Sequence, residues 1–365
     1  LMRKNNIAVF MGEAKFKTKE TIIVTDKDGK VSELSARNFI VATGASPMVP
    51  AGWKVDGEKI VTYLEAILQE KLPKSVIIIG SGAIGVEFAT VWSSYGVEIT
   101  IVEMLPRLVP LEDEEISKEL EKEFKKRGIK PLTGHKVEAV EATASGVQVT
   151  VSANGQQTVL EAEQALVAIG FRPNSKGLGL EEIGVNINER GFVEINEKMQ
   201  SSVPNIYAIG DVTGKLMLAH VGSAMGIVAA ENIAGVETVT LDYEMMPRAT
   251  YCQPQIASFG LTEAQAKERG YTVQIGRFPF QANGKALGLG DYAGFVKLVV
   301  DEKYGEILGA HMIGPEVTEL LPELTLAHMM ELTPHEIARN VHAHPTLSEV
   351  LMEAAHAAEG AAIHI

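Results

Sequence analysis

Short apolar runs that end in glycine alternate with helical patterns in the middle of the chain. Residues 76–79 form a β-branched run that leads into Gly80, and apolar positions at helical spacing follow over residues 85–95. A second apolar run covers residues 97–103, and residues 113–127 form a charged amphipathic pattern with one apolar face. Strand and helix patterns in alternation are typical of a doubly wound α/β sheet. We therefore predict an α/β, Rossmann-like domain in this part of the chain.

Three further apolar runs follow the second helical pattern. They cover residues 136–142, 147–151 and 164–169, and we expect them to complete a mixed sheet with the first two runs. Nearer the N-terminus, residues 7–45 alternate apolar and polar positions over short stretches, with Asp28 and Gly29 as a turn signal. That alternation predicts a small antiparallel meander.

The C-terminal third of the chain has a third kind of pattern. Apolar runs at residues 256–260 and 295–300 predict strands, and helical patterns rich in Met, His and Glu follow them. A strand at residues 206–209 and a helix over residues 219–233 precede this region. These changes of pattern divide the chain into four parts, which are residues 1–59, 60–173, 174–243 and 244–365.

Charge and cysteine content exclude several classes of protein. The 365 residues include 33 Lys and Arg against 47 Asp and Glu, which gives a net charge of −14 at pH 7. Nucleic-acid binding needs a cationic face, so this balance argues against it. No apolar run approaches the roughly 20 residues that span a bilayer. A single cysteine, Cys252, excludes an intrachain disulfide and fits a reducing compartment, so we expect a cytoplasmic protein that contacts neither nucleic acid nor membrane.

The segment GSGAIGVE, residues 80–87, has the glycine spacing of a dinucleotide-binding loop. It matches G-x-G-x-x-G between a predicted strand and a predicted helix. In such a loop Gly80 permits a tight turn, Gly82 lets the backbone approach a pyrophosphate, and Gly85 lets the helix pack closely on the strand. The helix N-terminus adds free N–H groups for the anion. We therefore predict a dinucleotide site here.

Two acidic residues near this loop are candidate contacts for the cofactor. Glu103 stands 18 residues after Gly85, at the end of the second strand. A carboxylate there accepts hydrogen bonds from a ribose 2′-OH and repels a 2′-phosphate, so we predict NAD rather than NADP. Arg107, close by, weakens that prediction. Glu87 could contact the cofactor or could be an ordinary acid in the first turn of the helix, favoured by its dipole.

Four further stretches resemble one family. They are FIVATGASPMVP (39–50), ALVAIGFRPN (165–174), VPNIYAIGDV (203–212) and VHAHPTLSEV (341–350). The first looks like the family's A-T-G-x-x-P segment, the second like the exit strand of its NAD domain, the third like its second flavin motif and the fourth like its C-terminal active-site motif. The chain thus resembles the flavin-dependent pyridine nucleotide-disulfide oxidoreductases and, within them, the dihydrolipoamide dehydrogenases.

The resemblance implies an architecture, a reaction and a set of partners. Residues 1–59 would be part of an FAD-binding domain, 60–173 the NAD-binding domain, 174–243 a return segment of the FAD-binding domain, and 244–365 an α+β dimerisation domain. The implied reaction oxidises dihydrolipoyl groups of 2-oxoacid dehydrogenase or glycine cleavage complexes, and passes electrons through a disulfide and FAD to NAD+. The implied partners are a second copy of the chain and a lipoyl domain.

The resemblance also implies cofactor contacts. Asp211 follows a predicted strand, where a carboxylate can bind flavin ribitol hydroxyls or can simply form a turn. The implied flavin contacts are Ala14, Thr43, Gly44, Ala45, Asp211, Met217, Leu218, Ala219 and His220. The implied NAD contacts are Gly80, Gly82, Gly85, Glu87, Glu103, Val137 and Gly170.

The C-terminal motif supplies the candidate catalytic residues. His344 precedes Pro345, which restricts the backbone, and Glu349 follows five residues after the histidine. A carboxylate that faces an imidazole fixes its tautomer and stabilises its protonated form, as a base for thiols requires. The resemblance implies that this pair takes a proton from the dithiol and acts on the partner subunit's disulfide. Alternatively, Thr346 and Glu349 form a T-x-x-E capping box. We expect His342 to be structural.

Two features of the family do not occur in this sequence. These are a first glycine loop for the flavin and a C-x-x-x-x-C redox pair. We therefore expect a truncated form in which FAD binding is weak or absent and which is inactive alone. The alternatives are a related glutathione, mercuric or transhydrogenase-type reductase, or an inactive NAD-binding dimerisation fragment. NADP-dependent relatives would have arginines where Glu103 stands. We expect Cys252 to be a core residue and predict no metal site.

Overall fold

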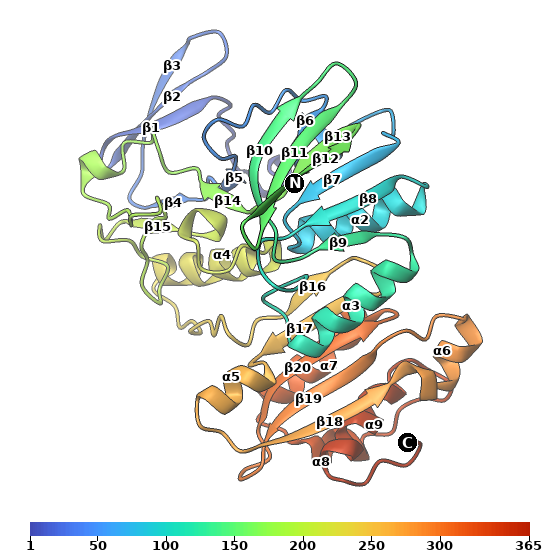
Figure 1. Cartoon of the computed structure of the whole chain (residues 1–365). Helices are drawn as coiled ribbons and strands as arrows, with labels where there is room; N and C mark the ends of the chain where they lie inside the picture. Colours follow the sequence, from blue (N-terminus) through green and yellow to red (C-terminus); the bar gives the residue numbers. More distant parts are fainter. The chain divides into compact units, whose positions relative to one another are not determined.

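The computed structural model describes residues 1–365 (Figure 1). It forms two compact units. The first comprises Leu1–Ser46 and Phe171–Tyr243, and the second comprises Pro47–Gly170 and Glu244–Ile365. Each unit is therefore built from two separate stretches of sequence. Among the helices of both units, none has the length and the apolar character that crossing a membrane requires.

The first unit begins with the predicted meander. Strands β1 (Glu13–Thr18), β2 (Thr21–Thr25) and β3 (Val31–Ser35) form an antiparallel sheet. Asp26 closes the turn between β2 and β3, because its carboxylate accepts the N–H groups of Asp28 and Lys30, each at 2.9 Å. The turn signal in the sequence is confirmed.

Two short parallel strands build the rest of this unit. Strand β4 (Phe39–Val41) pairs with β15 (Ile206–Ala208), and a 3-10 turn, η3 (Gly210–Thr213), leads from β15 toward helix α4 (Ala219–Ala234). Both the strand and the helix lie where the sequence predicted them. The remaining elements are η1 (Arg3–Asn5), η2 (Glu181–Ile183) and the pair β5 (Ala45–Pro47) and β14 (Phe171–Pro173).

A parallel sheet forms the N-terminal half of the second unit. Its strand order is β6-β13-β7-β8-β9, and all neighbouring strands are parallel. This arrangement confirms the Rossmann-like prediction. Its strands are β6 (Ile60–Val61), β7 (Ser75–Ile79), β8 (Glu98–Val102), β9 (Lys130–Leu132) and β13 (Gln164–Val167), with helices α1 (Tyr63–Ala66), α2 (Ala83–Ser94) and α3 (Glu114–Lys126).

The expected mixed sheet is wrong in one respect. Strands β10 (Lys136–Ala142), β11 (Val147–Ala153) and β12 (Gln156–Ala162) form a separate antiparallel sheet, and only β13 joins the parallel one. Burial explains the separation. Strands β7 and β13 are buried almost throughout, as central parallel strands require, whereas β10 and β12 expose many of their residues to solvent.

The C-terminal half of the second unit is a five-stranded antiparallel sheet covered by helices. The strand order is β16-β17-β20-β19-β18. Its strands are β16 (Arg248–Thr250), β17 (Gln255–Gly260), β18 (Val273–Pro279), β19 (Phe295–Asp301) and β20 (Ile307–Gly314). Its helices are α5 (Glu263–Glu268), η4 (Phe280–Ala282), α6 (Gly284–Leu289), α7 (Val317–Met329), α8 (Pro334–Arg339) and α9 (Glu349–Ala358).

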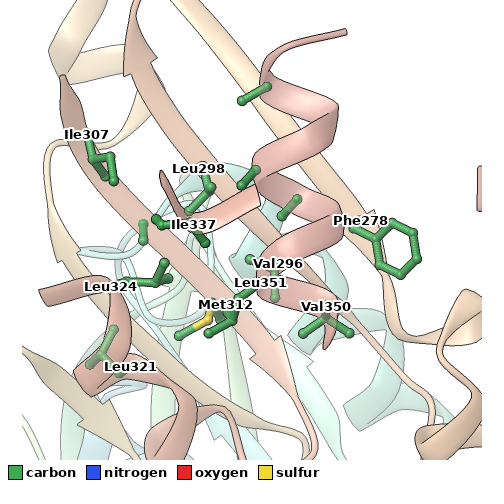
Figure 2. Packing of buried hydrophobic residues seen from close by; sticks show 14 of the residues in the cluster. Phe278, Val296, Leu298, Ile307, Met312, Leu321, Leu324, Ile337, Val350 and Leu351 are labelled. Carbon is green, nitrogen blue, oxygen red and sulfur yellow. The ribbon is translucent and has the colours of Figure 1, made fainter. Parts of the chain in front are cut away.

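Helices α7, α8 and α9 pack on one face of this sheet (Figure 2). The core between them contains Phe278, Leu298 and Met312 from the sheet, and Leu324 and Leu351 from the helices. The opposite face packs against the Rossmann-like half, since Ile313 and Phe295 belong to the same buried cluster as Phe124 of α3. The sheet is thus enclosed on both faces, and β19 and β20 are buried along their whole length.

Gly276 sets how closely α9 approaches the sheet. A Cβ atom at this position would lie 2.1 Å from the carbonyl oxygen of Ala354 and 2.8 Å from the Cβ of Ala358. Only a residue without a side chain therefore lets β18 lie against α9 at this distance. Because Glu349 is the first residue of α9, this contact also fixes the position of a candidate catalytic residue.

Candidate functional site

The glycine loop has the geometry that its spacing predicts. Gly80 has φ +101°, and a Cβ there would lie 2.3 Å from the carbonyl oxygen of Ala168. A Cβ on Gly85 would lie 2.1 Å from the carbonyl oxygen of Gly80, so this glycine permits the close packing of helix on strand. The space around Gly82 is open, and this residue is the N-cap of α2. Gly82 and Ala83 are also exposed, so an anion can approach the N-terminus of α2.

Glu103 lies directly against this loop. Its Oε2 accepts hydrogen bonds from the Ser81 N–H (2.9 Å) and the Ser81 hydroxyl (2.8 Å), and its Oε1 accepts the Leu105 N–H (2.8 Å). The side chain is almost fully buried. Gly80 follows β7 and Glu103 follows β8, so both lie at the carboxyl edge of the parallel sheet, where ligands of such sheets bind.

Arg107, the residue that weakened the coenzyme prediction, is engaged elsewhere. Its guanidinium donates hydrogen bonds to the carbonyl oxygens of Pro110 (3.0 Å) and Glu112 (3.3 Å). The same segment supports the glycine loop, because the Val109 N–H donates to the Ser81 carbonyl at 3.1 Å. The arginine therefore stabilises its own loop with the two main-chain contacts.

Two other predicted NAD contacts lie at the same edge of the sheet. Gly170 comes shortly after β13 and has φ +110°. Val137, on β10, packs against a cluster that contains Ile79 and Val102, the last residues of β7 and β8. The structure therefore brings Val137 and Gly170 to the end of the sheet that carries the glycine loop.

Glu87 has a contact that neither sequence interpretation included. Helix α2 begins at Ala83 and has no acidic residue in its first turn, so the interpretation of Glu87 as a first-turn acid is wrong. Its carboxylate instead accepts the Tyr251 N–H at 2.8 Å. Burial raises the pKa of Glu87, and this hydrogen bond opposes the rise only in part. Glu87 thus ties α2 to the chain segment that enters β17.

The predicted flavin contacts lie in the first unit. Thr43 and Gly44 follow β4 and are held by Asn174, whose N–H donates to the Gly44 carbonyl (3.0 Å) and whose side-chain amide donates to the Thr43 carbonyl (3.0 Å). Asp211 follows β15, the parallel neighbour of β4, so it lies at the same edge. Burial raises the pKa of the Asp211 carboxyl group.

The start of α4 supplies the rest of this set. Leu218 is the N-cap of α4, Ala219 its first residue and His220 its second, while Met217 precedes them and is partly exposed. Ala45 lies on β5, next to Gly44. Ala14 differs from the others, since it lies on β1 of the three-stranded sheet with its side chain exposed.

His344 and Glu349 form the pair that the C-terminal motif predicted. His344 Nδ1 lies 2.9 Å from Glu349 Oε1, and the imidazole is 77% exposed while the carboxylate is only 20% exposed. Because a carboxylate accepts, Nδ1 carries the hydrogen, and Nε2 has no hydrogen-bond partner. A neutral imidazole in this tautomer presents a basic nitrogen to solvent, as a general base must.

Glu349 also has part of the capping role that the alternative interpretation gave it. Its Oε2 accepts the Thr346 N–H at 2.8 Å. The Thr346 hydroxyl, however, donates to the Ala343 carbonyl, and Ser348 is the N-cap of α9, so the reciprocal bond of a capping box is missing. Burial alone would raise the pKa of Glu349, but the hydrogen bonds from Thr346 and His344 outweigh it and the pKa is lowered.

His342 is held in the protein rather than facing solvent. Its Nδ1 lies 2.8 Å from the Asn340 carbonyl oxygen, and its Nε2 lies 2.9 Å from Glu323 Oε1 on α7. Its side chain is 3% exposed. His342 was predicted to be structural, but nothing in the sequence indicated its partner Glu323, which lies 19 residues away in another helix.

A buried charge cluster between α3 and the antiparallel sheet was missed from the sequence. Lys297, on β19, is 1% exposed and contacts carboxylates of Asp113 (3.0 Å), Glu115 (2.7 Å) and Glu263 (2.7 Å). Burial favours the neutral amine, but these carboxylates outweigh it and raise the pKa of Lys297 to about 12. The sequence carries one signal, because Lys297 interrupts an apolar strand.

Cys252 and the other histidines show no arrangement for redox or metal chemistry. The Cys252 thiol is buried and donates to the Pro254 carbonyl at 3.2 Å. Burial raises the pKa of this thiol, so it is neutral and unreactive. No group of three or more His, Cys, Asp or Glu side chains could hold a metal ion. Cys252 is a core residue, as expected.

Comparison with known proteins places these features in a family. Residues 1–226 match the family model for pyridine nucleotide-disulphide oxidoreductases, and residues 246–355 match the model for their dimerisation domain. Dihydrolipoyl dehydrogenase of Mycobacterium leprae is 54% identical over 98% of this chain and 77% of its own. The enzymes of that name from Corynebacterium glutamicum and Bacillus subtilis are 48% and 42% identical, over 99% and 100% of this chain and 78% and 79% of their own.

Solved structures agree with the sequence comparison. LpdA from Mycobacterium tuberculosis superposes with a TM-score of 0.91 at 28% identity, over 97% of this chain and 78% of its own. The HOCl-induced flavoprotein disulfide reductase RclA from Escherichia coli gives 0.86 at 26% identity, over 95% and 78%. The fold predicted from the sequence, an α/β architecture with a C-terminal dimerisation domain, is confirmed. This chain belongs to the pyridine nucleotide-disulphide oxidoreductase family.

Proposed function

We propose that this chain works as a dihydrolipoyl dehydrogenase in which His344 and Glu349 handle the proton of the dithiol substrate. The three curated relatives described above carry that name, at 42–54% identity over almost the whole chain. The family uses FAD and NAD(H). One observation carries the proposal for this chain's own residues, namely the 2.9 Å contact that orients His344 and leaves its Nε2 free.

The role of His344 follows from its exposure and its partner. Nε2 accepts a proton from a substrate thiol, which becomes the more nucleophilic thiolate. Glu349 keeps the opposite nitrogen protonated and stabilises the imidazolium that forms. Glu349 is itself held by the Thr346 N–H, so the imidazole is oriented by a fixed group. Neither residue exchanges electrons. In this family the electrons pass through a redox disulfide and the cofactors, and these 365 residues contain no such cysteine pair. Activity assays therefore require the holoenzyme with that disulfide.

The residues at the sheet edge fit an NAD molecule. The open space at Gly82 and the free N–H groups of α2 suit a pyrophosphate, and Glu103 suits a ribose 2′-OH. When bound, NAD accepts a hydride. We propose NAD rather than NADP, because Glu103 would repel a 2′-phosphate and Arg107 already donates to two carbonyl groups. Gly80, Gly85, Glu87, Val137 and Gly170 complete this proposed site.

The residues at the edge of β4 and β15 fit the polyol part of FAD, which supplies the electron relay in this family. Asp211 offers a half-buried carboxylate, and the start of α4 offers N–H groups at the same end of the strands. The proposed flavin contacts are Ala14, Thr43, Gly44, Ala45, Asp211, Met217, Leu218, Ala219 and His220.

Two experiments test the reaction and the coenzyme. Reduction of NAD+ by dihydrolipoamide in the holoenzyme supports the proposal, whereas NADPH-dependent reduction of glutathione disulfide would support a sister reductase instead. Calorimetric titration should show tighter binding of NADH than of NADPH by about 2 kcal/mol, which is about 30-fold. Equal affinities for the two coenzymes would contradict the role given to Glu103.

The dimerisation domain implies a homodimer, and its surface suits one. The apolar side chains of α7 point in two directions. Leu321 and Leu324 are buried in the core, whereas Leu326, Met329 and Met330, at the end of the helix, are exposed. We propose that the exposed part contributes to an isologous interface, which light scattering at micromolar concentration should report as a dimer. A monomer would contradict it. A lipoyl domain as substrate carrier, residues 244–365 as the dimerisation domain and a cytoplasmic location belong to the same proposal.

A further inference from the structure

The first half of the loop that carries His344, residues 340–345, has little apolar burial to hold it. The loop connects the C-cap of α8 at Asn340 to the start of α9 at Glu349. Asn340, Val341 and Ala343 are exposed, and so are His344 and Pro345. Between residues 340 and 345, only the His342 side chain enters the protein. The first half of the loop therefore depends on polar contacts. The second half is held by Leu347, which packs against the core, and by the Asn283 side-chain amide, which donates to the Thr346 carbonyl at 3.0 Å.

The polar contacts of the first half meet at one carboxylate on α7. Glu323 Oε1 lies 2.9 Å from His342 Nε2 and accepts the Asn340 side-chain N–H at 3.2 Å. His342 Nδ1 closes the arrangement by its 2.8 Å contact with the Asn340 carbonyl oxygen. Glu323 is a firm anchor, because its neighbours Leu321 and Leu324 are buried in the core beneath α7.

We propose that His342 and Glu323 are positioning residues that hold the loop so that His344 meets Glu349. This proposal rests on the proposed role of His344 as a base. Neither His342 nor Glu323 takes part in proton transfer. The carboxylate of α7 fixes the first half of the loop, and the carboxylate at the start of α9 orients the imidazole in the second half. His342 is the link between the two, since it lies two residues before His344.

The electrostatics of Glu349 agree with this arrangement. The lowered pKa of Glu349 arises against the effect of burial, through hydrogen bonds from Thr346 and His344 and through the charges of His344 and His342. Both histidines of the loop therefore act on the same carboxyl group.

The test compares Glu323→Ala with Glu323→Gln. Alanine removes the acceptor and is tolerated by the fold, because Glu323 is one-third exposed, while glutamine keeps an acceptor oxygen for His342. His335→Gln is the matched control, since His335 forms a similar contact with Glu359 (3.1 Å) away from this loop. Nitrogen-15 NMR reports the tautomer of His344, and carbon-13 NMR reports the titration midpoint of Glu349.

We expect Glu323→Ala to shift His344 from the Nδ1–H tautomer toward a mixture and to raise the Glu349 midpoint by about half a pH unit. Loss of the negative charge at Glu323 alone would lower that midpoint, so a rise can come only through the histidines. In the holoenzyme, kcat should fall about tenfold with little change in KM. Glu323→Gln should restore most of each signal, and His335→Gln should change none of them.

The outcome that overturns the proposal is specific. If Glu323→Ala leaves the His344 tautomer and the Glu349 midpoint unchanged, the His342 contact serves stability alone. The same experiments distinguish a failure of this proposal from a failure of the proposed function. Should Glu323→Ala change the tautomer while His344→Gln retains full activity, the loop is positioned as proposed but His344 is not the base.

Discussion

Two groups of charged side chains in the second unit differ in almost every respect. The Lys297 ammonium is buried between α3 and the antiparallel sheet and contacts three carboxylates, of which that of Asp113 is buried and those of Glu115 and Glu263 are partly exposed. The His344–Glu349 pair lies at the surface, and one of its imidazole nitrogens has no partner. Lys297 has three donors and three acceptors within reach, so all of its hydrogen-bonding capacity is used.

The comparison separates groups that hold the protein together from groups that react. Removal of one partner from a buried, fully bonded cluster leaves uncompensated charge in a dry environment. An exposed pair adds little to stability, because water replaces what is lost. A base, in contrast, needs an unused lone pair that substrate can reach. Full use of hydrogen bonds is therefore typical of a structural group. A base requires an accessible free nitrogen on an oriented ring, but His311 and His335 show that a free nitrogen does not by itself identify one.

The largest effect should come from His344→Gln. In the holoenzyme that carries the redox disulfide, we expect dihydrolipoamide oxidation to fall by about 10²–10⁴-fold, the usual contribution of a general base. The free energy of unfolding should change by less than about 0.5 kcal/mol, because the imidazole is exposed. Steady-state kinetics and urea denaturation on the same sample check both parts. The control is His335→Gln, and an activity loss as large in that variant would remove the special role of His344.

Lys297→Met should have the opposite effect, with a large loss of stability and little change in activity. The substitution leaves the buried Asp113 carboxylate without its cation, and we expect a loss of about 3 kcal/mol in the free energy of unfolding. Glu115 and Glu263 are partly exposed and keep their contacts with Arg277 and Lys267. Activity of the folded protein should remain close to that of the parent. Lys122→Met on the surface of α3 is the control and should change stability by less than about 1 kcal/mol. A loss that small for Lys297 would make the two regions energetically alike.

Gly276→Ala should affect both stability and activity, because it acts on the helix that carries Glu349. The added Cβ must displace the main chain of α9 at Ala354, and we expect a loss of about 1–3 kcal/mol in stability. Activity should also fall. Gly288→Ala in α6 is the matched control, since a Cβ there meets no atom within 4 Å. Thermal unfolding distinguishes them, and equal stability for both variants would show that α9 adapts freely.

The smallest effect concerns pH and the buried region. His311 lies beside Lys297 on the next strand, is fully buried and has no partner for Nδ1. Burial lowers its pKa, although the hydrogen bond to the Leu261 carbonyl and the charges of Glu112 and Asp113 oppose this, and the charge of Lys297 supports it. A lowered pKa in the folded state means that the unfolded state binds the proton first. The stabilisation is therefore complete above about pH 6.5 and is lost as the pH falls toward the folded value.

This dependence can be measured by urea denaturation as a function of pH. The slope attributable to His311 should not exceed about 1.4 kcal/mol per pH unit. His311→Gln keeps a donor for the Leu261 carbonyl but cannot titrate, so the slope below pH 6.5 should decrease. An unchanged slope would assign the acid sensitivity to other groups.

The sequence predicted the parts of the site whose residues are close together along the chain. The glycine loop, Glu103 and the His344–Glu349 pair each occupy one short segment with a recognisable spacing. The partners of Lys297 could not be found in this way, since they come from α3 and α5, far from β19 in sequence. Glu323 was not predicted for the same reason, since it lies on another helix than His342. The separate β10–β12 sheet was missed because alternation of apolar residues identifies a strand but not the sheet that it joins.

The two hydrogen bonds that Glu103 accepts from Ser81 have a consequence for engineering the coenzyme preference. A common design replaces the acid by a small or basic residue so that a 2′-phosphate fits. Here the same carboxylate accepts both the N–H and the hydroxyl of Ser81, so its removal also loosens the loop that would face the pyrophosphate. Arg107 cannot compensate while it donates to Pro110 and Glu112. A variant that uses NADP therefore needs a new support for Ser81 as well as a new cation, and the two have to be introduced together.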